Sequence, residues 1–312
     1  MFERRAEVER VKKRLVLVKD QVERPSWLPH EEFPFVSRFA EIEGHRIHYV
    51  DEGDGPVLLF ANAGLWSFVW RDLIVRLRDR FRCVALDFPG AGLSSAAEGY
   101  RGGLEASSRV LEGFVRELDL RDVTLVLHDL GGPVGLGAGV RMPERIRGIA
   151  IVESFGWPLG FENPKVARIL RMTGAIRGID PVTSLAIRFT SGSYGVGRDL
   201  SPAARRAFRG PFRDREVRRR TFAMLGEAGR SDELFARIER AQRTVLGDRP
   251  IALVFGAESP STKEGFPERW KSRFPNADLL IVDGAHHFPM ADDPDLVARA
   301  LAGWWREEVR AA

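Results

Sequence analysis

Hydrophobic residues in this chain gather in short continuous runs, and stretches with helical periodicity separate most of these runs. Six runs are apolar almost throughout: residues 57–60, 81–86, 123–128, 146–152, 251–255 and 277–282. A run without polar alternation is typical of a parallel strand that is buried on both faces. Helices are expected between the runs, for example near 66–77, 103–118 and 294–310. The pattern predicts an α/β fold in which helices cover both faces of a mostly parallel, twisted sheet.

The regular alternation of strands and helices is interrupted twice. Residues 37–42 and 45–50 alternate apolar and polar positions around Glu43-Gly44, which predicts an antiparallel hairpin at the sheet edge. Between 155 and 245 the chain becomes basic and helical in pattern, so we expect an inserted helical cap. The core then consists of residues 23–154 and 246–312, and residues 1–22 form a charged helical arm.

The run at 123–128 leads directly into Asp129, and Gly131 and Gly132 follow. Glycine permits a sharp turn and close packing of the next helix. A strand–turn–helix that raises one polar side chain above a sheet is a nucleophile elbow, usually G-x-S-x-G. Here the raised residue is Asp129, and Leu127 replaces the first glycine. The alternative is that Asp129 only caps the following helix, a position that Asp favours.

The composition is that of an ordinary globular protein. The 312 residues are 44% hydrophobic and 29% charged, enough for one large domain with an insertion. The single cysteine, Cys83, excludes an intramolecular disulfide and suits a reducing compartment. The N-terminus has no apolar signal-peptide segment, and no stretch approaches the roughly 18 apolar residues of a membrane span. We therefore expect a cytoplasmic protein that does not span a membrane.

The net charge of +4 comes from arginine, which is densest at residues 205–220. Such a run could bind nucleic acid, but Phe208, Pro211 and Phe212 interrupt it and no nucleic-acid motif accompanies it. We interpret it as a solvated helical face and expect no nucleic-acid partner. Because no metal-ligand or phosphate-binding motif occurs either, we expect no metal and no cofactor. The oligomeric state is not indicated.

Polar residues follow three of the buried runs: Asp129, Glu153, and the pair His286-His287. The carboxyl ends of parallel strands form the ligand-binding edge of such a sheet. Nucleophile, acid and histidine in this chain order is one arrangement of a hydrolytic triad. The joint occurrence favours catalysis over helix capping for Asp129.

An aspartate nucleophile points to particular electrophiles. Asp is ionised near neutral pH and needs no base for its first attack. On an ester carbonyl it would form a labile anhydride, whereas on an sp³ carbon with a leaving group it forms a stable alkyl ester. A histidine of the pair His286-His287 would then activate water, with Glu153 orienting its ring. Backbone N–H groups of Ala63 and Leu130 are the expected oxyanion donors.

The sequence resembles the α/β-hydrolase superfamily, and within it the haloalkane-dehalogenase-like branch, over most of the chain. The resemblance rests on Glu153 and on RPSWLP at 24–29, IHYVDEG at 47–53, DFPGAGLS at 87–94, HDLGGP at 128–133, AFRGPF at 207–212 and GAHHFP at 284–289. It implies an α/β-hydrolase fold with Asp129 as nucleophile. It also implies that the base is His287 rather than His286, and that the acid lies after the sixth strand, at Glu153.

Two other residues could supply the acid. Glu258 follows the next strand, where most hydrolases of this fold keep their acid, although the expected spacing falls on Ser259. Asp283 directly precedes the histidine loop and is more simply read as shaping that turn. Glu153 is the preferred acid, and Glu258 stays as the alternative.

The resemblance departs from the branch at the two side chains that usually hold the leaving halide. The Trp after the nucleophile is replaced by Leu130, and the Asn of an H-G-N-P turn is replaced by Ala63. A halide loses hydration on entering a cavity, so missing donors should be costly. Trp66 and Trp157 could supply indole donors, though each is more often plain packing, and Asn62 is one position away.

Leu130, Phe155, Trp157 and Phe288 would line an apolar substrate pocket, with Asn62 and Trp66 beside it. An epoxide hydrolase is the alternative enzyme, but it normally needs cap tyrosines, and only Tyr194 of the three tyrosines lies in the cap. A non-catalytic ligand-binding member of the fold is a further alternative. The expected partners are a small apolar substrate and water.

Overall fold

The computed structural model describes residues 24–158, 185–192, 195–196, 200–227, 231–242, 244 and 246–311. The predicted arm at residues 1–22 and Tyr194 lie outside these ranges. The described residues form one eight-stranded sheet with the order β1-β2-β4-β3-β5-β6-β7-β8. The strands are β1 (Arg38–Ile42), β2 (His45–Glu52), β3 (Val57–Ala63), β4 (Arg82–Leu86), β5 (Val123–Asp129), β6 (Ile146–Ser154), β7 (Ile251–Gly256) and β8 (Asp278–Val282).

The sheet is mostly parallel, as the continuous apolar runs predict. The pairs from β4 through β3, β5, β6 and β7 to β8 are parallel, whereas β1 pairs with β2 and β2 with β4 in antiparallel fashion. The predicted edge hairpin is thus confirmed. β5 lies in the centre, and its first six residues are buried. Leu125 and Leu127 belong to one apolar core and Val126 to the other, so this strand is covered on both faces.

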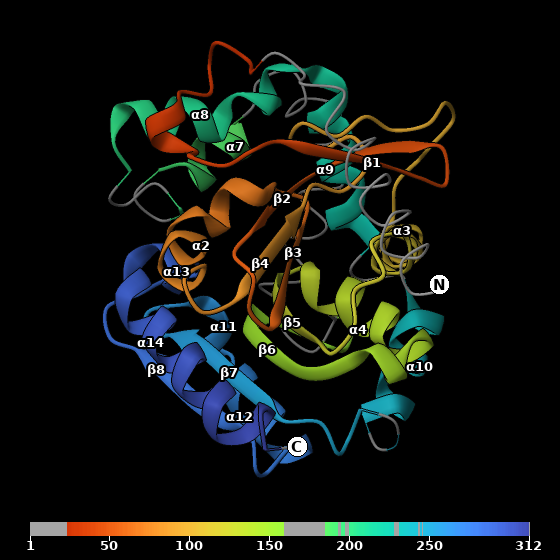
Figure 1. Ribbon diagram of the computed structural model, residues 1–312, viewed down its shortest axis with the longest axis vertical. Helices are drawn as coiled ribbons and strands as arrows, with labels where there is room; N and C mark the ends of the chain where they lie inside the picture. Colours follow the sequence, from red (N-terminus) through yellow and green to blue (C-terminus); the bar gives the residue numbers. More distant parts are fainter. Residues whose placement is uncertain are drawn as a thin grey trace, which may run out of the picture.

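Helices cover the two faces of the sheet (Figure 1). α3 (Leu104–Glu117) packs on α4 (Gly131–Arg141), and α4 contacts β3, β5 and β6. On the other side α14 (Pro294–Trp304) packs on α2 (Arg71–Leu77). The remaining core helices are η1 (His30–Glu32), η2 (Ser67–Trp70), η3 (Pro143–Arg145), α11 (Pro260–Lys263), α12 (Phe266–Arg273), α13 (Pro289–Asp292) and the π-helical turn η5 (Trp305–Val309). The predicted α/β fold class is confirmed.

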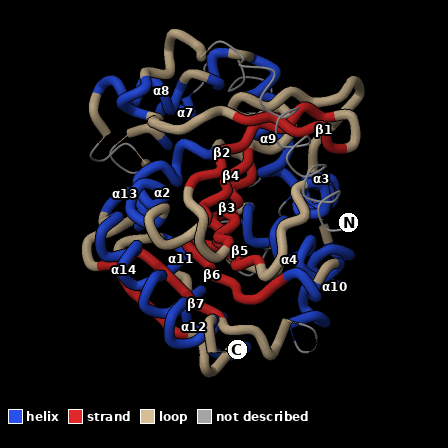
Figure 2. The backbone as a smooth tube through the Cα atoms, in the orientation of Figure 1, coloured by secondary structure: helices blue, strands red, loops and turns tan. Residues whose placement is uncertain are grey.

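The described residues between β6 and β7 are mainly helical, and we call residues 155–245 the cap. Its helices are α7 (Leu185–Thr190), α8 (Pro202–Arg209), η4 (Pro211–Arg213), α9 (Arg215–Glu227) and α10 (Asp232–Gln242). α7 and α8 lie together at the top of Figures 1 and 2, while α10 packs beside α4. Among the described residues, α8 also contacts η1, so cap helices reach the core at places far apart in the sequence.

Two local details differ from the sequence pattern. The predicted helix at 66–77 is divided into η2 and α2, and the backbone N–H of Ser67 donates to Asp87 Oδ1 at 2.7 Å. Within the arginine-rich run, Arg218 is buried and donates to the carbonyl oxygens of Phe212 and Arg213. That arginine stabilises the turn before α9 and is not part of a solvated face. In the described part of the chain, no helix combines the length and the apolar character that a membrane crossing needs.

Candidate active site

The turn between β5 and α4 raises Asp129 above the sheet. Asp129 has a φ of +50°, in the left-handed region that non-glycine residues rarely adopt. A Cβ on Gly131 would lie 2.1 Å from the carbonyl oxygen of Ala61, and one on Gly132 would lie 2.0 Å from Ser154 Oγ. Only glycine fits this close approach of helix to sheet. The N-cap of α4 is Leu130, and no side chain caps the helix, so Asp129 is not its cap.

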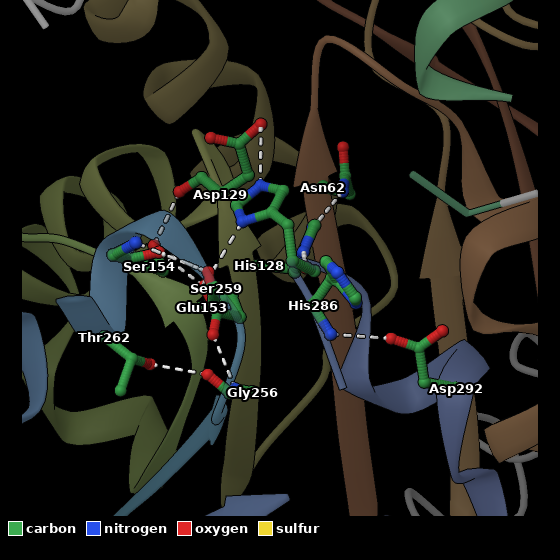
Figure 3. Close-up of polar contacts among 12 residues, drawn as sticks. Asn62, His128, Asp129, Glu153, Ser154, Gly256, Ser259, Thr262, His286 and Asp292 are labelled. Atoms are coloured by element: carbon green, nitrogen blue, oxygen red, sulfur yellow. Dashed lines mark hydrogen bonds and ion pairs between the residues drawn. The ribbon is translucent and has the colours of Figure 1, made fainter. Parts of the chain in front are cut away.

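His287 lies in the loop between β8 and α13 and faces two acidic residues, Asp129 and Glu153, which Figure 3 labels. Its Nε2 is 3.8 Å from Asp129 Oδ2, and its Nδ1 is 3.3 Å from Glu153 Oε2. The Asp129 and His287 side chains are 28% and 31% exposed, whereas that of Glu153 is fully buried. The imidazole therefore lies between a carboxylate that a ligand can reach and one that it cannot.

The Glu153 carboxylate is held by hydrogen bonds from the loop after β7. Oε1 accepts from the backbone N–H of Gly256 at 2.6 Å, and Oε2 accepts from the hydroxyls of Ser259, at 2.6 Å, and Ser261. Neither serine was expected to have a role in the site. The only signal in the sequence was the spacing at which most hydrolases of this fold keep their acidic residue, because that spacing falls on Ser259. In the structure the hydroxyl of Ser259 donates to Glu153, which lies on the neighbouring strand.

The alternative acid, Glu258, does not approach the histidine. Its side chain is 52% exposed and forms an ion pair of 2.7 Å with Lys263. Its backbone N–H donates to the carbonyl oxygen of Ala285. Glu153 is therefore the carboxylate that the fold brings to His287 Nδ1.

The charges of Asp129, Glu153 and His287 shift one another's pKa values. Burial lowers the pKa of His287, but the carboxylates of Asp129 and Glu153 outweigh this effect and raise the pKa to about 10. Burial raises the pKa of each carboxyl, yet the positive His287 brings the pKa of Asp129 and of Glu153 below their usual values. At neutral pH the site therefore holds two carboxylates around one imidazolium.

The two predicted oxyanion donors lie side by side. Ala63 ends β3 and pairs with Asp129 in the parallel register of β3 and β5, and Leu130 directly follows Asp129. The side chains of Ala63 and Leu130 are buried and carry no polar group. At these two positions, therefore, only the backbone N–H groups can donate a hydrogen bond to a negative charge.

Asn62 and Trp66, which we predicted to lie at the pocket, have their polar groups engaged within the protein. Asn62 Oδ1 accepts from the N–H of Leu65 at 3.2 Å, and Asn62 Nδ2 donates to His128 Nδ1 at 2.6 Å. The indole N–H of Trp66 donates to the carbonyl oxygen of Phe208 at 3.0 Å. The Trp66 indole N–H and one N–H of the Asn62 amide are thus bound within the protein.

His128 is a further residue whose place the sequence pattern did not indicate. It is fully buried, and its Nε2 lies 2.7 Å from the carbonyl oxygen of His287. Burial and the positive charge of His287 lower the pKa of His128 to about 4. His128 is therefore neutral, with its proton on Nε2 because a carbonyl oxygen can only accept, and with Nδ1 accepting from Asn62.

The predicted aromatic pocket residues are all buried. Phe288 lies against the rings of both His128 and His287, at centroid distances of 4.9 and 5.2 Å. Phe155 lies 6.3 Å from Phe235 of α10. Trp157 instead packs on Phe266 and Trp270 of the core, and the guanidinium of Arg269 covers its ring at 4.4 Å from the centroid. Phe288 is thus the aromatic residue next to the base, and Trp157 contacts α12.

No set of three or more His, Cys, Asp or Glu side chains within the described ranges is arranged to hold a metal ion.

Comparison with known proteins identifies the family to which the chain belongs. Residues 57–300 match the model of the alpha/beta hydrolase family. Haloalkane dehalogenase 2 of Mycobacterium tuberculosis is 31% identical over 276 residues, which cover 86% of this chain and 94% of that protein. A cis-3-alkyl-4-alkyloxetan-2-one decarboxylase of Shewanella oneidensis is 28% identical over 281 residues, covering 85% of this chain and 86% of that protein.

Solved structures agree with this fold. A putative ancestral haloalkane dehalogenase superimposes with a TM-score of 0.75 at 25% identity, covering 88% of this chain and 100% of that one. A haloalkane dehalogenase from Agrobacterium tumefaciens C58 gives a TM-score of 0.73 at 23% identity, covering 88% and 98%. The chain belongs to the alpha/beta hydrolase family, in which it is haloalkane dehalogenase-like.

Proposed function

We propose that this protein is a hydrolase that opens an sp³-carbon electrophile through an alkyl ester on Asp129, in the manner of a haloalkane dehalogenase. The observation that carries the proposal is the position of Asp129 at the strained elbow, 3.8 Å from His287 Nε2, with Glu153 on the opposite side of the imidazole. A triad that serves only to bind a ligand would not need a left-handed nucleophile position, which costs free energy.

In the first step a carboxylate oxygen of Asp129 attacks the carbon that bears the leaving group. The new C–O bond forms as the bond to the leaving group breaks, and the leaving group departs with its electron pair. The low pKa of Asp129 supports this role because the carboxyl is ionised before the substrate arrives. No general base is needed in this step.

Ester formation then changes the state of His287. The Asp129 ester carries no charge, so one of the two carboxylates that raise the pKa of His287 is lost while burial, which lowers it, remains. The imidazolium releases its proton to solvent and becomes a base. The intact Glu153 contact at Nδ1 keeps the lone pair on Nε2, which faces the ester.

In the second step His287 Nε2 takes a proton from water, and the hydroxide attacks the carbonyl carbon of the ester. The N–H groups of Ala63 and Leu130 stabilise the oxyanion. The intermediate then expels the alkoxide, which takes up a proton and leaves as the alcohol. Asp129 is again a carboxylate and His287 again an imidazolium, so the net products are an alcohol, the leaving anion and one proton.

The substrate should be small and apolar, because the residues predicted to line its site carry apolar side chains. Leu130, Phe155 and Phe288 are each no more than 3% exposed. Transfer of a hydrocarbon group from water into such surroundings is favourable. Its electrophilic carbon must reach Asp129, the partly exposed member of the two carboxylates.

A strained cyclic ester is a second candidate substrate, favoured by the side chains at Ala63 and Leu130. Neither can donate to a departing halide, whereas opening a four-membered lactone at its sp³ carbon leaves a carboxylate that spreads its charge over two oxygens. The Shewanella relative, named as an oxetan-2-one decarboxylase, is 28% identical. Such a substrate makes smaller demands on dedicated leaving-group donors than a halide does.

A substrate panel tests the proposal, with Asp129→Asn as the matched control because it removes the nucleophile but not the shape. Bromide release from bromohexane by the wild-type protein alone would support dehalogenation. Formation of a 3-hydroxy acid from a cis-dialkyl oxetan-2-one would favour the second candidate, and diol from styrene oxide would favour an epoxide hydrolase. Equal, background-level rates for both proteins on every substrate would contradict the proposed function and favour a binding protein.

A further inference from the structure

Two hydrogen bonds join the cap to the same short segment of the core. This segment, residues 62–66, comprises the last two residues of β3 and the turn after them, and it contains the proposed oxyanion donor Ala63; we call it the oxyanion turn. Thr221 Oγ1 of α9 donates to the carbonyl oxygen of Gly64 at 3.1 Å. The indole N–H of Trp66 donates to the carbonyl oxygen of Phe208 in α8 at 3.0 Å. Thr221 is only 7% exposed, so its bond to the turn is protected from water.

The peptide unit between Gly64 and Leu65 is held at both ends. Its carbonyl oxygen accepts from Thr221, and its N–H donates to Asn62 Oδ1 at 3.2 Å. Gly64 has a φ of +99°, a backbone conformation in which an L side chain would be strained. The orientation of the peptides next to Ala63 therefore depends on these two hydrogen bonds.

The same network continues to the base. Asn62 Nδ2 donates to His128 Nδ1 at 2.6 Å, and His128 Nε2 donates to the carbonyl oxygen of His287 at 2.7 Å. Figure 3 shows Asn62 and His128 at the side of the site away from Glu153. Asn62 is 1% exposed and His128 is fully buried, so water does not compete for these bonds.

We infer that Thr221, Asn62 and His128 are positioning residues that hold the oxyanion turn and the loop of His287 in a fixed relation, with Thr221 linking both to the cap. The inference rests on the proposed function and adds a specific kinetic consequence. The oxyanion and the base are used only in hydrolysis of the ester, whereas the first attack uses Asp129 alone. Loosening the network slows ester hydrolysis and spares ester formation.

Thr221 allows a clean test because matched variants exist. Thr221→Val removes the hydroxyl and keeps the branched shape, whereas Thr221→Ser keeps the hydroxyl donor. Thr221 Oγ1 also lies 3.1 Å from the carbonyl oxygen of Val217 in its own helix. Thr244→Val is the control for such local bonds, because Thr244 Oγ1 donates to the carbonyl oxygen of Arg240 at 3.2 Å and is exposed.

The rates of formation and decay of the Asp129 ester are measured by rapid quench and intact mass with bromohexane or, if that is inert, with the substrate that the panel identifies. For Thr221→Val we expect ester decay to slow about 3- to 10-fold, the typical effect of one lost hydrogen bond, with formation unchanged within about twofold. Thr221→Ser and Thr244→Val should decay at the wild-type rate. Asn62→Ala should slow decay at least as much as Thr221→Val.

Amide hydrogen exchange of residues 62–67 provides a readout that needs no turnover. Exchange should be faster in Thr221→Val than in Thr244→Val, and Thr221→Ser should match the wild type. If no substrate gives an ester while the exchange pattern appears, the proposed function fails and the structural link stands. Unchanged exchange in Thr221→Val, an equal slowing of ester formation and decay, or the same effects in Thr244→Val would overturn the inference.

Discussion

Glu153 Oε2 lies 3.3 Å from His287 Nδ1, although 134 residues separate the two in the chain. They meet because β6, β7 and β8 are parallel neighbours whose carboxyl ends share one edge of the sheet. Glu153 has a φ of +45° near the end of β6, and the N–H of Gly256 on the adjacent strand fixes its carboxylate. A buried, fully hydrogen-bonded anion at this position sets both the ring orientation and the charge of His287.

Replacing Glu153 tests its role in hydrolysis of the proposed Asp129 ester. Glu153→Gln keeps the shape but removes the charge that balances His287, so we expect hydrolysis of the Asp129 ester to slow by roughly 10²–10⁴-fold. Glu258→Gln is the matched control because Glu258 is exposed and pairs with Lys263. Single-turnover kinetics of both variants provide the comparison. A large loss with Glu258→Gln and none with Glu153→Gln would assign the acid to the loop after β7.

The raised pKa of His287 leads to a prediction about its titration. Burial lowers this pKa, and the two carboxylates raise it to about 10. Asp129→Asn removes one negative charge, as ester formation does, so the pKa of His287 should fall in that variant. The ring nitrogen chemical shifts of His287, followed by NMR between pH 5 and pH 11, measure it directly. An unchanged pKa in Asp129→Asn would show that Asp129 does not act on His287.

The glycines of the elbow should not tolerate a side chain. A Cβ at Gly131 would lie 2.1 Å from the main-chain oxygen of Ala61, so Gly131→Ala must move helix or sheet and should destabilise the fold by about 1–3 kcal/mol. Gly303→Ala is the control: it lies in α14 with no heavy atom within 4 Å of the added Cβ, and should stabilise by up to about 1 kcal/mol. Urea unfolding of both variants measures these changes. Equal stability of the two would contradict the close packing at the elbow.

The framework of the fold and the elbow could be predicted from the sequence because they follow from local pattern. A buried run that ends in Asp129 before two glycines allows few other structures, and the strand order brings His287 to the same edge. The partners of Asn62 could not be predicted in this way, since they depend on how a turn after β3 meets His128 on β5. The two serines that hold Glu153 lie at the start of α11, after β7, and only the folded chain brings them to Glu153.

Trp66 shows why side-chain roles are harder to predict than strands. An indole three residues after Ala63, the expected oxyanion donor, was a reasonable candidate donor, yet its N–H is taken by a carbonyl oxygen 142 residues away in the cap. Buried polar groups find partners wherever the fold allows. The Trp66 indole N–H therefore links the core to the cap.

The central claim is that Asp129 forms a covalent ester which only His287 can help water to cleave. The most direct measurement is intact mass, followed by peptide mapping, of His287→Ala after incubation with bromohexane or the substrate that the panel identifies. His286→Ala serves as the control. Our account predicts a stable adduct of one alkyl group on the peptide that contains Asp129, absent from His286→Ala and from the double variant with Asp129→Asn. A wild-type protein that turns the substrate over while His287→Ala carries no adduct, or carries it elsewhere, would contradict it.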